Sequence, residues 1–108
     1  MIDFDLYDLL ELFEREAIEY SRDQGFYMNS KTDVLGIELL LSMSIYSNSC
    51  RISLIHKEYE VTLVSLEIKN VSKVEKREEI LLIHSENRSS PVTINFKPRF
   101  SIGQINLG

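Results

Sequence analysis

The sequence predicts an α+β fold in which one N-terminal amphipathic helix packs on a largely antiparallel six-stranded sheet. In the first quarter of the chain, apolar residues recur at three- and four-residue steps, whereas from residue 37 onward they alternate with polar ones. A run of strands that follows a helix at one end of the chain is typical of α+β architecture. The pattern leaves open whether the strands form a sandwich or a half-barrel.

The helix is predicted from about residue 4 to residue 22. Its apolar face is a single stripe, with acidic residues at most intervening positions, made of Leu6, Leu9, Leu10, Phe13, Ala17 and Tyr20. Asp3 or Asp5 can cap the start of the helix by accepting backbone N–H bonds. Gly25, just beyond the last periodic residue, is the expected stop.

Six strands are predicted after the helix, at residues 37–46, 50–55, 59–68, 80–83, 92–96 and 100–107. The third changes phase near Val64 and Ser65, which indicates a bulge or a short corner. The continuously apolar run 80–83 indicates a central strand that is covered on both faces. The polar stretches 29–33 and 70–79 are expected to be connections.

Length and composition are those of one globular domain, residues 1–108. The chain has 108 residues, of which 44% are hydrophobic and 27% charged, so that it can bury one core. No stretch approaches the roughly 18 apolar residues that span a bilayer, and the first residues are acidic where a secretory signal is basic. Cys50 is the single cysteine, so no internal disulfide can form. We therefore expect a cytoplasmic protein that does not enter a membrane.

The negative charge is concentrated at the N-terminus. The formal net charge is −5, and residues 1–23 carry −6 while the remaining 85 residues carry +1. This balance disfavours a nucleic-acid binder, which needs clustered cations. The candidate partner-binding residues are the acids Asp8, Glu11, Glu14 and Glu19, which would offer a negative stripe to a basic protein. The alternative is a solvated helix face that is acidic for solubility.

The sequence predicts neither catalysis nor a cofactor or metal. Phosphate-loop, dinucleotide-binding, H-E-x-x-H and C-x-x-C motifs are absent. His56 precedes Lys57 and Glu58 in what is more simply a solvent-facing turn. Cys50 and His84 could in principle form a nucleophile and base, but Cys50 shares the alternation of Ile52 and is more simply a buried hydrophobe.

The plan of the chain resembles that of the bacterial immunity proteins that neutralise toxins of contact-dependent inhibition and related interbacterial systems. The resemblance lies in an acidic domain of this size with an N-terminal helix and a β-rich remainder. It is carried by the segments Glu60–Leu63, Ile80–Ile83, Val92–Phe96 and Phe100–Ile102. It covers about two-thirds of the chain and includes no diagnostic motif, so no functional residue is carried over from it.

The resemblance implies a cytosolic protein that binds a cognate toxin domain, often a basic nuclease, and blocks its active site or substrate groove. Acidic side chains would then stand in for nucleic-acid phosphates. Two other hypotheses remain open at this point. One is a small ligand-binding or enzymatic β domain that uses His84, or His56 near Tyr59, in a concave pocket. The other is an adaptor subunit whose acidic helix meets a different basic protein.

Overall fold

The computed structural model describes residues 1–14, 25–97 and 100–103, together with the backbone of residues 18–21. The described part contains one helix, α1 (Leu6–Phe13), and nine strands. The strands are β1 (Ile18–Ser21), β2 (Phe26–Thr32), β3 (Ile37–Ser44), β4 (Ser49–His56), β5 (Val61–Ile68), β6 (Val71–Arg77), β7 (Ile80–Ser85), β8 (Val92–Asn95) and β9 (Ser101–Gly103).

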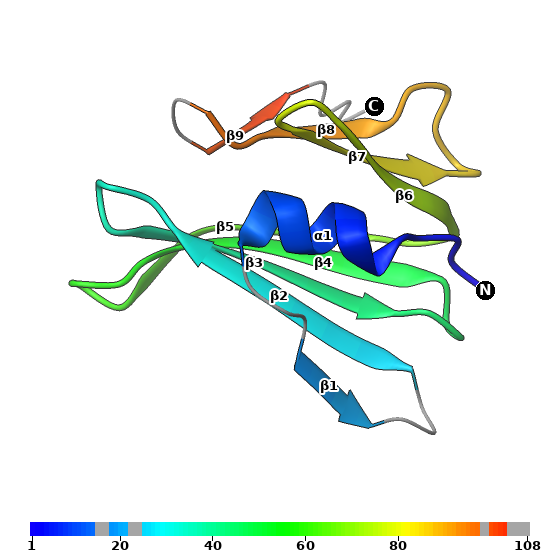
Figure 1. The fold of residues 1–108 in the computed structure, drawn as a ribbon, viewed down its shortest axis with the longest axis horizontal. Helices are drawn as coiled ribbons and strands as arrows, with labels where there is room; N and C mark the ends of the chain where they lie inside the picture. Colours follow the sequence, from blue (N-terminus) through cyan, green and yellow to red (C-terminus); the bar gives the residue numbers. More distant parts are fainter. Residues whose placement is uncertain (15–17, 22–24, 98–99, 104–108) are drawn as a thin grey trace.

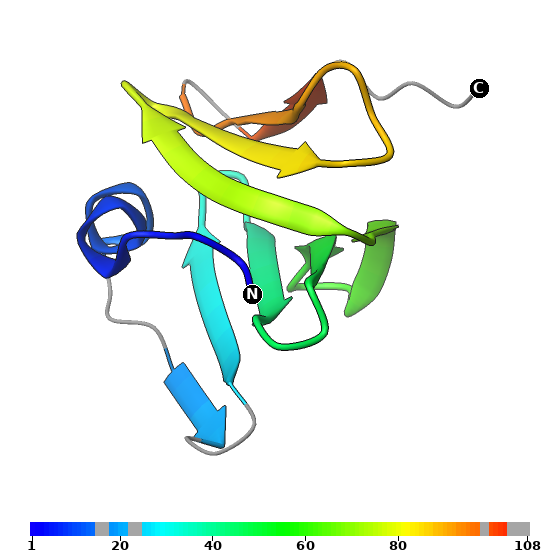
Figure 2. The same ribbon diagram turned by 90° about the vertical axis from the view of Figure 1, so that its right-hand side faces the viewer.

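The strands form two sheets that lie one above the other as the layers of a sandwich (Figures 1 and 2). The first sheet has the order β1-β2-β3-β4-β5 and the second the order β6-β7-β8-β9, and every strand pair is antiparallel. The α+β class and the antiparallel pairing are thus confirmed. The prediction of a single six-stranded sheet is wrong, because the chain crosses from the first sheet to the second between Ile68 and Val71.

Strands β2 and β6 were not predicted. Most of their residues lie in the stretches 29–33 and 70–79, which were expected to be connections. In β2 the only buried side chain is polar, that of Asn29, so no apolar alternation marks the strand. In β6 a register shift between Val71 and Lys73 inserts Ser72 as an extra residue. Val71 and Val74 therefore both face the core although they are three positions apart, which hides the period of two.

Helix α1 is shorter than predicted because it ends at Phe13. Asp5 caps its start, as predicted, since the Tyr7 N–H donates to Asp5 Oδ1 at 2.8 Å. Glu14 then adopts the left-handed conformation (φ 60°) and donates its N–H to the Leu10 carbonyl. Residues 18–21 pair with β2 instead of continuing the helix. Residues 15–17 and 22–24 of the predicted helix lie outside the described residues.

Gly25 has a role other than the predicted helix stop. It lies just before β2 with φ +65°, and its carbonyl accepts a bond from the Ile45 N–H at 3.1 Å. A Cβ atom at this position would lie 2.5 Å from Ile45 Cγ1. The close approach of the two segments therefore requires glycine.

The strands with clear alternation are confirmed. β3 and β4 form a hairpin in full register from Ile37 opposite His56 to Ser44 opposite Ser49. The predicted bend in β5 is a bulge, because Leu54 pairs with Val64 while Ile55 pairs with Thr62, so that Leu63 is extra. β7 lies between β6 and β8, and its run Leu81 to Ile83 is buried on both faces.

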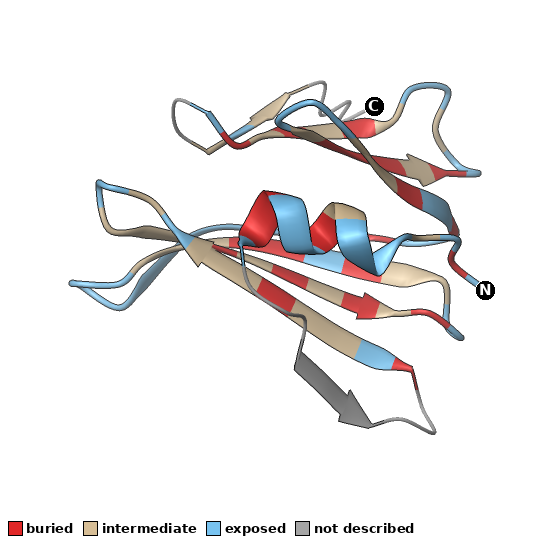
Figure 3. Ribbon diagram, viewed as in Figure 1, coloured by how far each residue is buried: buried red, intermediate tan, exposed pale blue. Residues whose placement is uncertain are grey.

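The core is one cluster that takes side chains from both sheets and from α1 (Figure 3). Leu39, Leu41 and Ile52 contribute from the first sheet, and Leu81 and Ile94 from the second; all five are fully buried. From the helix come Leu9, Leu12 and Phe13. The Phe13 ring lies edge-on to that of Phe96, with centroids 5.1 Å apart, so the helix is packed into the open side of the sandwich.

We expect Phe13→Ala to lower the free energy of unfolding by about 3–5 kcal/mol, because it leaves a cavity against Phe96. Tyr7→Ala is the matched control, since it truncates an aromatic side chain on the same helix that is 75% exposed. It should change stability by less than about 0.5 kcal/mol. Urea denaturation measures both. Equal losses in the two variants would contradict the packing of Phe13 described above.

Candidate protein interface

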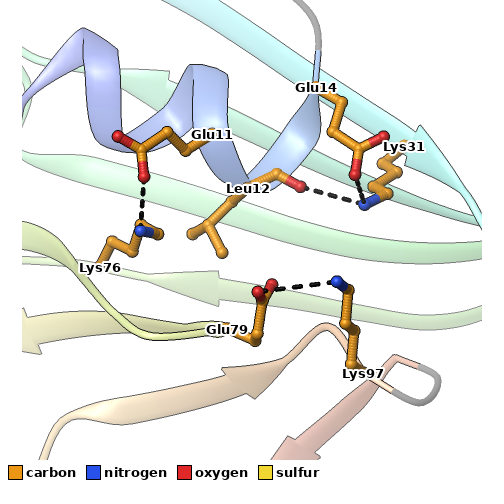
Figure 4. Close-up of polar contacts among 7 residues, drawn as sticks. All are labelled: Glu11, Leu12, Glu14, Lys31, Lys76, Glu79 and Lys97. Carbon is orange, nitrogen blue, oxygen red and sulfur yellow. Dashed lines mark hydrogen bonds and ion pairs between the residues drawn. The ribbon is translucent and has the colours of Figure 1, made fainter.

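Two ion pairs attach α1 to both sheets. Glu11 Oε2 lies 2.6 Å from Nζ of Lys76 in β6, and Glu14 Oε1 lies 3.0 Å from Nζ of Lys31 in β2 (Figure 4). The Lys31 ammonium also donates to the Leu12 carbonyl at 3.3 Å, which satisfies one of the free carbonyls at the helix end. Two of the four predicted partner-binding acids are therefore already paired within the molecule.

These contacts shift the pKa values of Glu14 and Lys76. The hydrogen bond from Lys31, followed by its charge, holds the pKa of Glu14 below its ordinary value of 4.5. The hydrogen bond to Glu11 raises the pKa of Lys76, and the nearby charge of Asp8 acts in the same direction. Both lysine side chains are 22% exposed, whereas Glu11 and Glu14 are 62% and 67% exposed. The carboxylates thus remain accessible from outside while they hold the helix.

The other two predicted acids lie in different settings. Asp8 is half-buried in the first turn of α1 and forms no ion pair with the described residues. Glu19 lies on β1, where its backbone is opposite Tyr27, and its side chain lies outside the described part of the structure. The expectation that all four acids share one helix is therefore wrong. Their role in binding a partner stays a prediction.

A wide groove runs beside the first turn of α1. It has a volume of about 520 Å³ and is lined by residues of the N-terminal segment and of β6, namely Asp3, Phe4, Asp5, Leu6, Tyr7, Asp8, Lys73, Val74 and Glu75. Leu6 and Tyr7 are 51% and 75% exposed. Leu6 and Leu10 were predicted to face the core and are instead exposed, because the buried stripe is Leu9, Leu12 and Phe13. An exposed aromatic side chain such as that of Tyr7 is the kind of residue that is enriched at protein-binding surfaces.

A charged cluster on β6 and β7 borders this groove, and two of its members, Lys73 and Glu75, line it. Glu75 lies 3.0 Å from Lys73, 3.3 Å from Arg77 and 3.3 Å from Nε2 of His84. The hydrogen bond from Lys73 is the main cause of the lowered pKa of Glu75, and the proximity of His84 acts in the same direction. The sequence did not reveal this cluster, because Lys73, Glu75 and Arg77 were expected to lie in a solvated loop. As strand β6, they lie at steps of two on one face, and His84, the partner of Lys73, joins them from β7 across the ladder.

The candidate reactive groups occupy structural positions. Cys50 is buried in β4, as predicted, and burial raises the pKa of its thiol to about 12, so that the thiolate needed for nucleophilic attack is scarce. His56 stacks against Tyr59 with ring centroids 4.8 Å apart. Neither His56 nor His84 lines the groove beside α1. In the described part of the chain, no three His, Cys, Asp or Glu side chains gather as a metal site.

Comparison with known proteins gives one clear structural likeness. No family model and no curated protein matches the chain. Among solved structures, it is similar to a chain of the "Contact-dependent growth inhibition toxin - immunity protein complex from Klebsiella pneumoniae 342". The TM-score is 0.80 at 17% sequence identity, and the match covers 93% of this chain and 92% of that one.

The two chains share a fold. The likeness extends over nearly the whole of both chains. The resemblance to proteins of contact-dependent inhibition is thereby confirmed at the level of the fold. Within the described residues, no helix is long and apolar enough to cross a membrane.

The Glu14–Lys31 pair gives stability a defined dependence on pH. Because the folded pKa of Glu14 lies below its ordinary value of 4.5, the pair stabilises the folded state above that pH. This contribution disappears as the pH falls through the lower folded pKa. Glu14→Gln should therefore be less stable than the parent chain at about pH 7, and the difference should shrink as the pH falls below 4.5 and through the folded pKa of Glu14.

Urea midpoints measured across this range test the expectation. Glu86→Gln is the control, because Glu86 is exposed and forms no ion pair with the described residues. A difference between parent and Glu14→Gln that stays constant with pH would show that the ion pair does not contribute.

Proposed function

We propose that this chain is an immunity-type protein that binds a cognate toxin domain and neutralises it without chemistry of its own. The observation that carries the proposal is the shared fold, over 93% of this chain, with a chain of a toxin–immunity protein complex. Such a complex contains a toxin and its inhibitor, and the features of this chain fit the inhibitor. Its thiol has a raised pKa, Glu75 is held by three basic groups, and its exposed apolar residues lie among carboxylates.

We further propose that the toxin is basic, as a nuclease domain is, and that it meets the acidic surface of α1. The support is the net charge of −6 over residues 1–23 on an otherwise almost neutral chain. Asp3, Asp5 and Asp8 surround Leu6 and Tyr7 at the groove. Carboxylates in this position would attract a surface that is built to hold phosphates and would speed encounter. Tyr7 would supply the buried anchor of the interface.

Purification with the polypeptide encoded by the gene immediately upstream tests the main proposal. We expect a stable complex on size-exclusion chromatography, and loss of the growth arrest that the upstream polypeptide causes when it is produced alone. An unrelated acidic protein of similar size serves as the control for non-specific charge effects. Two separate elution peaks and undiminished growth arrest would refute the immunity function.

A charge-reversal series tests the role of the acidic helix. Asp8→Lys and Glu11→Lys should each weaken binding of that polypeptide by roughly tenfold and reduce the dependence of affinity on salt. Glu14→Lys and Glu19→Lys extend the series to the helix end and to β1. Glu86→Lys makes the same change of charge in an exposed loop remote in sequence and should bind as the parent does.

Thermal unfolding of each variant separates loss of binding from loss of the Glu11–Lys76 and Glu14–Lys31 contacts. If correctly folded variants retain both the parent affinity and its salt dependence, the helix is not the contact surface.

A further inference from the structure

The free edges of the two sheets are not alike. At the edge of the second sheet, Asp3 runs beside β6, donating to the Ser72 carbonyl at 3.0 Å and accepting from the Val74 N–H at 2.9 Å. The edge strands β1 and β9 have only four and three residues. β5 is the exception, since it has eight residues and pairs only with β4 among the described strands.

β5 is both exposed and apolar. Residues 61–65 are all exposed, and they include Val61 at 49%, Leu63 at 53% and Val64 at 37%. The strand holds neither lysine nor proline, the residues that most often protect an edge, and its single charge, on Glu67, is engaged by Arg51 at 3.0 Å. The bulge at Leu63 interrupts the edge at one point. It leaves the regular stretch Val64–Ile68, where every second N–H and C=O is directed outward and pairs with no other described strand.

The turn that precedes β5 adds charge to this edge. Glu58 and Glu60 are exposed there, and neither forms an ion pair with the described residues. Lys57, in the same turn, is paired with Glu38 at 3.7 Å and does not neutralise them. The hairpin tip formed by β4 and β5 projects from the body of the molecule (Figure 3). One end of the bare edge is thus marked by two uncompensated carboxylates.

We propose that β5 is a strand-addition site, at which an extended segment of the neutralised toxin domain pairs with Val64–Ile68 as a sixth strand of the first sheet. This inference rests on the immunity function proposed above. Apolar side chains of the added segment would continue the row of Val64 and Leu66, and polar ones would lie beside Ser65. A basic residue of the segment would lie next to Glu58 and Glu60.

Charge favours this occupant over a second copy of the chain. Two copies would bring together two molecules of net charge −5, whereas a segment with a basic end gains from the same carboxylates. β5 is also distinct from the acidic helix surface. β3 and β4 separate it from β2, and α1 and β5 lie on opposite sides of the molecule (Figure 2). The segment would therefore be a second point of attachment for the same partner.

Hydrogen exchange on the complex with the upstream polypeptide tests the proposal. Alternate amides of Val64–Ile68 should exchange at least about tenfold more slowly in the complex than in the free chain. Leu63→Lys places a cation on the edge beside the expected basic residue, and it should weaken binding by roughly tenfold or more. The double variant Glu58→Lys with Glu60→Lys should do the same without altering the strand.

The matched control is Tyr46→Lys, which also replaces an exposed apolar residue by lysine, in the turn at the other end of β3. It should bind as the parent does. Thermal unfolding of Leu63→Lys checks that the edge variant is folded. If it is not, the Glu58 and Glu60 variant and the amide exchange of the parent complex decide the outcome.

The possible failures are distinguishable. A complex that forms without slower exchange in β5, and that tolerates the edge variants, would overturn strand addition and leave the immunity function intact. Absence of any complex would overturn both. A parent chain that is dimeric by light scattering, with Leu63→Lys monomeric, would assign the edge to a second copy and refute the proposed occupant.

Discussion

The N-terminal segment is the element on which the arrangement of the two sheets depends. Its backbone bonds to both layers, since the Ile2 N–H donates to the Ile45 carbonyl next to β3 and Asp3 pairs with β6. Helix α1 then repeats the connection with side chains, through Glu11 to the second sheet and Glu14 to the first. Because Leu9, Leu12 and Phe13 fill the space between these contacts, the segment closes one side of the sandwich and completes its core.

This closure also explains why the edges of the sheets differ. The N-terminal segment covers the edge at β6, but no described strand pairs with the outer edge of β5 on the opposite side. Glu11 and Glu14, which help to close the sandwich, also remain accessible to solvent. They hold the helix through lysines that are largely covered, while their own side chains stay more than half exposed. A surface can therefore be structural and accessible at once, and its charge does not reveal which role it serves.

The sequence predicted those elements whose side chains alternate between a buried and a solvated face. β3 and β4 were found on this basis, as was the bulge in β5, whereas β7 was found from its continuous apolar run. β2 escaped detection because it buries a polar residue, Asn29, and β6 because its bulge breaks the period. The predicted helix was too long because the helical spacing of apolar residues continues past Phe13. In the structure, residues 18–21 form strand β1 and pair with β2. Tertiary pairing here overrides local pattern.

The sequence predicted which acidic residues form the candidate site, but not the contacts that they make. Composition located the acids, and alternation placed Cys50 in the core. The partners of Glu11 and Glu14 lie 65 and 17 residues away, a distance at which no spacing rule applies. The exposure of Leu6 and Tyr7 could not be foreseen either, because it depends on how far the helix rolls into the gap between two sheets. The free edge of β5 could not be predicted either, because it depends on the order of the strands in the sheet.

The uncovered β5 edge has a consequence for the behaviour of the chain in solution. A long apolar edge invites aggregation, and proteins commonly guard such segments with flanking charges that act as gatekeepers. Glu58 and Glu60 occupy this position, and the net charge of −5 adds colloidal repulsion between molecules. The repulsion that comes from net charge disappears near the isoelectric point of about 5.0. Glu58 and Glu60 thus serve solubility in two ways, as charges that flank the exposed strand and as part of the net charge of the chain.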